Sequence, residues 1–229
     1  MKQLATPEVN VCTIEDPIEM IEPAFNQMQV QHNIDLTFAS GVRALMRQDP
    51  DIIMVGEIRD RETAEIAIHA ALTGHIVFST LHTNDAAGAA TRLTDMGIEP
   101  FLIASSAIGI AAQRLVRKVC DHCKKPYAAS PELLKSLGLA PGAVTFYRGE
   151  GCAACGNEGY KGRIGIYELM QMNETIRTLI IAKASSSAIK AAALQAGFRS
   201  LRQEGLLKAA EGITTVEEVL RVTQEAEGI

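Results

Sequence analysis

The chain has 229 residues, 47% of them hydrophobic and 21% charged, and a formal net charge of −5 at pH 7. This length and composition support one substantial core, or one core with a smaller satellite, and the negative charge argues against a nucleic-acid-binding protein. No apolar run approaches the roughly 18 residues of a membrane span, and the first residues, MKQLATPEVN, lack the apolar segment of a signal peptide. We therefore expect a soluble, cytoplasmic protein.

The first predicted strand covers residues 9–14 (VNVCTI) and ends at Glu15-Asp16-Pro17, because a proline holds the preceding residue in an extended conformation. An alternating pattern over residues 25–30 predicts a second short strand at a sheet edge. The acidic residues that follow the first strand form either a solvated turn or part of a site at the sheet edge.

A helical period predicts a helix over Leu36–Gln48, with Thr37 or Asp35 as its N-cap. Arg43 and Arg47 are four residues apart and therefore project from one face of this helix. They are either solvated, or they reach a nucleotide at a subunit boundary as arginine fingers do.

The centre of the chain predicts a ligand site. The apolar run Ile52–Val55 is too short for a helix and precedes a helical pattern, which is typical of a buried parallel strand. Glu57 and Arg59 follow it, and a second predicted strand over residues 76–81 ends at His82. The carboxyl edge of a parallel sheet is where α/β proteins bind ligands. An acid that polarises water, a cation and an imidazole suit phosphoryl transfer at this edge.

The patterns on both sides of this site are mostly helical. We predict helices over residues 61–72, with Asp60 as N-cap, and over residues 86–96. A longer, mostly apolar helix is expected over Phe101–Val119, with cations near its end: Arg114, Arg117 and Lys118. These cations either stabilise the helix dipole or contact an anionic surface, such as acidic lipid head groups or an acidic partner.

Five cysteines divide into one isolated residue and two C-x-x-C pairs. Cys12 lies in the first predicted strand and is expected to be a core thiol. The two pairs are separated by 28 residues and fit a tetrahedral four-thiolate zinc site: Cys120, Cys123, Cys152 and Cys155. The alternative is a set of buried thiols without a ligand, or a redox pair. A helical insert is expected between the pairs over Ser130–Leu139.

The C-terminal part predicts one strand followed by helices. The strand covers Ile164–Met170. Helical patterns then follow over residues 173–183, 186–196, 200–210 and 214–222. We assign no catalytic residue to these helices.

Six motifs follow one another in an order that is highly specific to one protein family: TIEDPIE (Thr13–Glu19), DPDIIMVGEIRD, GHIVFSTLHTNDA (Gly74–Ala86), RLTDMGIEPF, AQRLVRKVC and GYKGRIGIYEL. The resemblance that these motifs carry extends over nearly the whole chain. The chain closely resembles the ATPases that drive type II secretion and type IV pilus assembly, whose aspartate box, Walker B region and histidine box are the first three of these motifs.

The resemblance implies an α/β fold with a RecA-like P-loop NTPase core, a four-cysteine zinc-binding insertion and a small C-terminal helical subdomain. The corresponding domains are residues 1–118, 119–158 and 159–229. The phosphate-binding loop G-x-x-x-x-G-K-S/T is absent from the sequence, and in the family it lies just upstream of the aspartate box. We therefore expect this chain to be the C-terminal portion of a longer protein and to be inactive alone.

The resemblance also implies residue roles. Glu57 is the catalytic base or the acid that orients water, aided by Glu15, which holds magnesium or water. Arg59 stabilises charge on the transferred phosphoryl group, and His82 senses the γ-phosphate of ATP. His75 belongs to the same histidine box but is the weaker functional candidate.

The segment before the Walker B region also resembles that of the family, which favours a nucleotide-binding role for Arg43 and Arg47, in the same subunit or in its neighbour. The resemblance further implies ATP, Mg²⁺ and a structural Zn²⁺, a ring of identical subunits (a hexamer), and partners in the inner-membrane platform and linker proteins of the machine. No nucleic-acid partner is expected. The protein would be cytoplasmic and peripheral at the inner membrane through these partners.

The DMGIEPFLIASS run is slightly more similar to type II secretion ATPases, so a motor for type II secretion is our first hypothesis. A pilus assembly (extension) ATPase is the alternative, whereas retraction ATPases usually lack the four-cysteine module. A second hypothesis, of a different class, is a non-catalytic docking module whose active surface is the zinc site.

Overall fold

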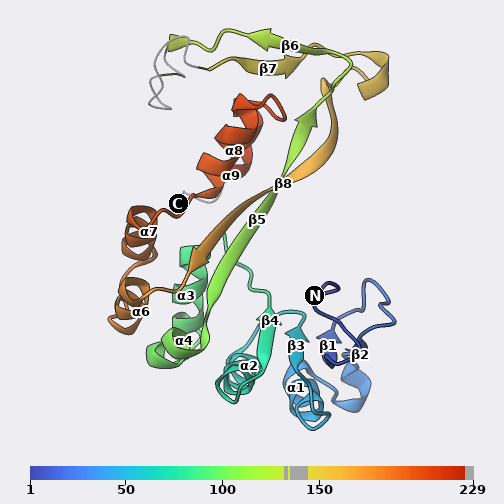
Figure 1. Cartoon of the computed structure of the whole chain (residues 1–229), viewed down its shortest axis with the longest axis vertical. Coiled ribbons are helices and arrows are strands. Elements are labelled where there is room, and N and C mark those ends of the chain that lie inside the picture. Colours follow the sequence, from blue (N-terminus) through green and yellow to red (C-terminus); the bar gives the residue numbers. More distant parts are fainter. Residues whose placement is uncertain (132–133, 135–143, 225–229) are drawn as a thin grey trace. The chain divides into compact units, whose positions relative to one another are not determined.

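The computed structural model describes residues 1–131, 134 and 144–224 (Figure 1). The described residues form two compact units. The first unit contains Met1–Thr83, Ala87–Ile108 and Met172–Lys190. The second contains Asn84–Ala86, Gly109–Gln171 and the described part of the chain from Ala191 onward. The three-domain division expected from the sequence stays a prediction.

A four-stranded sheet forms the centre of the first unit. Its strands are β1 (Val11–Glu15), β2 (Asn26–Gln29), β3 (Ile52–Val55) and β4 (Ile76–Ser79), in the order β2-β1-β3-β4. Every neighbouring pair is parallel. The predicted buried parallel strand β3 and the edge position of β2 are confirmed. Because the strands are parallel, their carboxyl ends meet at one edge of the sheet.

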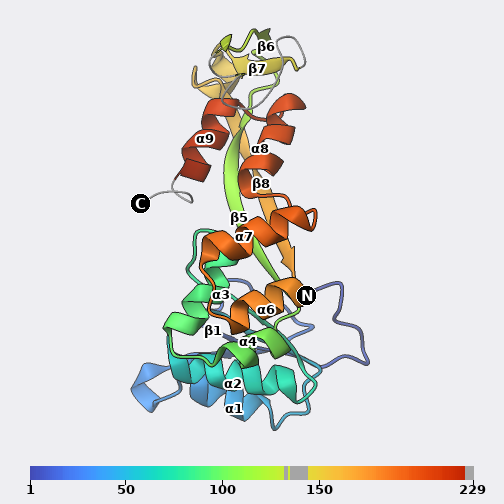
Figure 2. The same cartoon turned by 90° about the vertical axis from the view of Figure 1, so that its left-hand side faces the viewer.

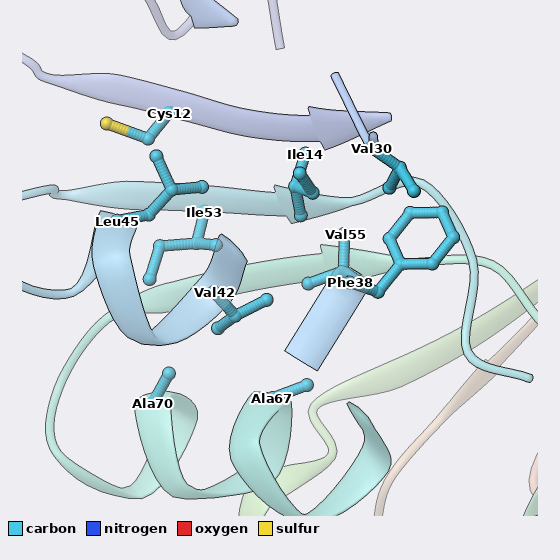
Figure 3. Packing of buried hydrophobic residues seen from close by; sticks show 10 residues of the cluster. All are labelled: Cys12, Ile14, Val30, Phe38, Val42, Leu45, Ile53, Val55, Ala67 and Ala70. Carbon is cyan, nitrogen blue, oxygen red and sulfur yellow. The ribbon is translucent and has the colours of Figure 1, made fainter. Parts of the chain in front are cut away.

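Two helices cover one face of this sheet. Helix α1 (Phe38–Leu45) packs on β1 and β3, and α2 (Arg61–Leu72) packs on β4 and α1. Helix α1 begins later than predicted because Thr37 is extended and its hydroxyl caps the first turn. It also ends earlier, at Leu45, so Arg47 lies beyond the helix and does not share a helix face with Arg43 as predicted. Asp60 caps α2 as expected. Figure 3 shows the shared core: Cys12, Ile14, Val30, Phe38, Val42, Leu45, Ile53, Val55, Ala67 and Ala70.

Further helices complete the first unit. The described elements are the short 3₁₀ helix η1 (His32–Ile34), α3 (Ala86–Asp95), α4 (Pro100–Ser106) and α6 (Glu174–Ile181). Helices α4 and α6 pack together, and Arg177 donates a hydrogen bond to the carbonyl of Ala107. Helix α7 (Ser186–Gln195) follows. No helix among the described residues is long and apolar enough to cross a bilayer.

The long helix predicted over Phe101–Val119 is wrong. Helix α4 ends at Ser106, and residues Gly109–Val119 form strand β5, which pairs antiparallel with β8 (Tyr160–Gln171). Exposure alternates along much of β5, as expected of a ribbon with one covered face. Arg117 and Lys118 are therefore strand residues, and a helix dipole does not explain them.

Helices α8 (Leu201–Ala210) and α9 (Val216–Gln224) lie along one face of the β5–β8 ribbon (Figure 2). Their shared core contains Val116, Ile166, Leu201 and Val222. The four predicted C-terminal helices are thereby confirmed. A second antiparallel pair, β6 (Lys124–Tyr127) and β7 (Phe146–Gly149), and the 3₁₀ helix η2 (Ala153–Cys155) complete this unit. Most of the insert predicted over residues 130–139 lies outside the described residues.

Candidate functional site

The chain that leaves β3 is fixed against the chain that leaves β4. The N–H of Ile58 donates to the carbonyl of Thr80 at 2.9 Å, and the Thr80 hydroxyl donates to the carbonyl of Gly56 at 2.6 Å. A Cβ at Gly56 would lie 3.2 Å from the carbonyl oxygen of Ile14, so glycine allows β1 to approach closely here. These contacts place Glu57 and His82 next to each other at the carboxyl edge of the sheet.

Both oxygens of the Glu57 carboxylate have a partner. Oε1 pairs with the Arg59 guanidinium, and Oε2 lies 3.1 Å from Nε2 of His82. The Glu57 side chain is 13% exposed, whereas the His82 side chain is 87% exposed. The hydrogen bond from Arg59, helped by His82 and opposed by burial, holds the pKa of Glu57 below its ordinary value. Glu57 is therefore ionised at neutral pH, as an acceptor for a proton of water requires.

The end of β1 contributes two more carboxylates. Oε1 of Glu15 accepts hydrogen bonds from the Thr13 hydroxyl at 2.6 Å and from Nε2 of Gln27 at 3.0 Å. The neighbouring Asp16 adds to the raised pKa of Arg59, whose main cause is the hydrogen bond to Glu57. The sequence predicts Asp16 only as part of an acidic turn, and the structure associates it electrostatically with Arg59.

The other predicted site residues do not join Glu57. Nη2 of Arg43 pairs with Oε1 of Glu62 at 2.8 Å, which joins α1 to α2, and Arg47 is exposed. Nδ1 of His75 lies 3.0 Å from the carbonyl of Ala70, next to the end of α2. His75 precedes β4 and His82 follows it, so the strand separates them. Within this chain, the structure brings together Glu57, Arg59 and His82.

The four cysteines of the two C-x-x-C pairs gather in the second unit, with all their sulfur atoms within 4.8 Å of one another. The Sγ distances are 3.8 Å for Cys120–Cys152, 3.9 Å for Cys123–Cys155 and 3.8 Å for Cys152–Cys155. A disulfide needs about 2.05 Å. A tetrahedral zinc with Zn–S bonds of about 2.3 Å needs sulfur atoms about 3.8 Å apart. The cluster therefore fits a four-thiolate zinc site.

At Cys155, backbone groups favour the thiolate form that a metal requires. Burial disfavours ionisation of Cys155, yet the N–H groups of Cys152 and Gly159 each lie 3.3 Å from its Sγ and lower its pKa to about 6. Thiolates rather than thiols bind metals. Four sulfur atoms would complete the tetrahedral shell of a bound zinc and would leave no open position for a substrate, as in structural zinc sites.

Comparisons with known proteins agree over nearly the full chain. Residues 1–221 match the family model described as "Type II/IV secretion system protein". The chain is 54% identical to the type IV pilus assembly ATPase PilB of Thermus thermophilus, over 98% of this chain and 26% of that protein. It is also 54% identical to type II secretion system protein E of Pseudomonas aeruginosa, over 94% of this chain and 43% of that protein.

Solved structures show a similar fold. The pilus retraction motor PilT with bound ADP is 27% identical, with a TM-score of 0.69 over 96% of this chain and 55% of that one. The Legionella pneumophila ATPase DotB has a TM-score of 0.65 at 23% identity, which supports the α/β fold alone. The chain spans about a quarter of the length of PilB and less than half of the length of protein E. It belongs to the Type II/IV secretion system protein family.

Proposed function

We propose that the protein containing this chain is an ATP-driven motor for type II secretion. The single observation that carries the proposal is the pairing of Glu57 with Arg59 and His82 at the carboxyl edge of a parallel sheet. The names of two relatives support ATP hydrolysis, because one is named a type II secretion system ATPase and the other a type IV pilus assembly ATPase. Pilus assembly is the second candidate, because relatives with that name are equally similar.

In this proposal the residues of the sheet edge perform phosphoryl transfer to water. The ionised Glu57 orients the attacking water and accepts its proton. Arg59 stabilises negative charge on the transferred phosphoryl group, and His82 contacts the γ-phosphate of ATP. Glu15 holds water or Mg²⁺, which would neutralise phosphate charge when bound.

Arg43 and Arg47 are the proposed residues for a nucleotide at a subunit boundary. Arg43 lies on α1 and contacts Glu62, and Arg47 lies in the turn after α1 with its side chain exposed. Their side chains do not join the Glu57 cluster within this chain, which favours action in trans in a ring of identical subunits, a hexamer. His75 supports the start of β4 rather than the phosphate.

The phosphate-binding loop of a RecA-like core is proposed to precede this chain in the intact protein. Among the described strands, β4 pairs with β3 alone, so its other backbone edge has no partner among them. A further strand paired with this edge of β4 would bring the loop to the Glu57 edge of the sheet. The chain by itself is therefore expected to lack ATP turnover.

The four-cysteine cluster is proposed to hold a structural Zn²⁺, which would cross-link the end of β5, the first C-x-x-C turn and η2. The motor is proposed to work on the cytoplasmic side of the inner membrane, bound to the platform and linker proteins of the machine.

The test is magnesium-dependent ATP hydrolysis by the intact protein, with the 229-residue chain as the comparison. We expect phosphate release from the intact protein only. Turnover by this chain alone would contradict the role of the preceding phosphate loop. No turnover by the intact, assembled protein would favour a docking module built on the zinc site.

A further inference from the structure

A buried carboxylate in β8 joins the first residues of two helices. The Glu168 residue is 3% exposed, and its oxygens accept the backbone N–H groups of Ala86 at 2.6 Å and Leu201 at 2.9 Å. Ala86 begins α3 and Leu201 begins α8. Burying an anion is costly unless it is hydrogen-bonded, and the N-terminus of a helix is where an anion is stabilised.

A second side chain of the same ribbon holds the same segment. Nη2 of Arg114, on β5, lies 3.2 Å from the carbonyl oxygen of Asn84 and 3.4 Å from its Oδ1. The segment Asn84–Ala86 belongs to the second compact unit, whereas the residues up to Thr83 belong to the first. Both strands of the β5–β8 ribbon therefore contact the segment 84–86, which begins two residues after His82.

We propose that Glu168 and Arg114 are positioning residues for ATP hydrolysis. They hold the segment Asn84–Ala86 against the ribbon and thereby restrict the orientations open to His82, which lies two residues before Asn84. Glu168 also binds the start of α8, so the same carboxylate connects the histidine segment with the C-terminal helices. This inference rests on the proposed function and adds two residues of the second unit to it.

Glu218 supplies a matched control within the same unit. It is 1% exposed and also accepts a backbone N–H, that of Arg117 at 3.1 Å. It pairs as well with the guanidinium groups of Arg117 and Arg221. None of these contacts involves residues 84–86. Loss of Glu218 should therefore weaken the packing of α9 without releasing the segment after His82.

The experiment compares Glu168→Gln, Arg114→Gln and Glu218→Gln in the intact protein. A glutamine at 168 keeps the side-chain volume but offers one acceptor oxygen, and its amide donors face a backbone N–H. We expect kcat to fall at least about 10-fold, since a ~1 Å misplacement of a reacting group can cost about 100-fold. The KM for ATP should change little, because the interaction lost acts on the chemical step.

Arg114→Gln tests the same segment without placing a mismatched polar group in the core, and should lower kcat in the same direction but less. Hydrogen exchange at residues 84–87 should be faster in Glu168→Gln and unchanged in Glu218→Gln. The Glu218 variant should unfold at lower temperature with an unchanged kcat.

Two results would overturn the proposal. The first is a normal kcat in both Glu168→Gln and Arg114→Gln. The second is an equal fall of kcat in Glu168→Gln and Glu218→Gln, which would show a loss of stability rather than of positioning. An inactive wild-type protein would instead refute the proposed function. Faster exchange at residues 84–87 in Glu168→Gln would then still show that Glu168 holds this segment against the ribbon.

Discussion

Nε2 of His82 lies 3.1 Å from Oε2 of Glu57, although 25 positions separate the two residues in the chain. The contact exists because β3 and β4 are parallel neighbours in register, so that both residues leave the sheet at the same edge. The other carboxylate oxygen pairs with Arg59. The carboxylate of the proposed catalytic base therefore lies between two groups that also suit a phosphate.

Replacing Arg59 should change the pH dependence of ATP hydrolysis. The Arg59 guanidinium favours the ionised form of Glu57 and lowers its pKa. Arg59→Gln should therefore raise the pKa of Glu57, so that the base is protonated at a higher pH. We expect the acidic limb of the kcat profile to shift toward neutral pH.

Arg61→Gln is the matched control for this measurement, because Arg61 pairs with Glu65 on the surface of α2. Its profile should follow that of the wild type. An acidic limb that stays in place in Arg59→Gln would argue against Glu57 as the titrating base.

Glu218 should make stability depend on pH below the neutral range. Burial disfavours ionisation of Glu218, but the hydrogen bonds from Arg221 and Arg117 outweigh it and lower the carboxyl pKa to about 2. Because the folded pKa lies below that of the unfolded chain, the stabilisation is complete above the unfolded pKa and is lost as the pH falls toward about 2.

Glu218→Gln should therefore lower the free energy of unfolding at pH 7 by about 2 kcal/mol, since the arginines are partly exposed and their charge-assisted bonds are partly screened. The difference from the wild type should shrink as the pH is lowered from about 5, the region where free carboxyl groups begin to protonate. Denaturant titrations at several pH values measure it. An equal difference at every pH would contradict this role of the carboxylate.

The four-cysteine cluster should contain one zinc ion per chain, because four thiolates complete a tetrahedral shell. Cys152→Ser should abolish stoichiometric zinc in the purified protein and lower its melting temperature, since metal binding contributes to folding. Cys12→Ala is the control, because Cys12 is buried in the sheet core of the first unit. Its zinc content, measured by elemental analysis, should equal that of the wild type, and zinc retained in Cys152→Ser would refute the assignment.

The sheet edge was predictable from the sequence because its signals are local. The run Ile52–Val55 is apolar throughout and ends at a glycine, which indicates a buried parallel strand. The run IVFSTL before His82 follows a turn at Gly74 and indicates a second strand. Parallel strands share a carboxyl edge, so the proximity of Glu57 and His82 could be predicted from the sequence. The partner of Arg43 could not be predicted, because its contact with Glu62 depends on how two helices pack.

The ribbon shows why the rest was not predictable. The mostly apolar stretch Phe101–Val119 was assigned to one long helix, but Gly109–Val119 forms a strand because it pairs with β8, which lies far along the chain. For Glu168 the sequence does contain a signal. Alternation along β8 places it on the same face as Ile166 and Met170, which are both buried, so a buried carboxylate with partners was to be expected there.

The most direct measurement for the central claim is ATP hydrolysis by the intact protein, with the wild type compared with Glu57→Gln. The substitution keeps the size of the side chain and removes the base and its charge, so turnover should fall at least ~100-fold. Glu65→Gln, which changes a glutamate that pairs with Arg61 on the surface of α2, should retain wild-type turnover. A Glu57→Gln variant that hydrolyses ATP at the rate of the wild type would contradict the placement of the catalytic site at this edge of the sheet.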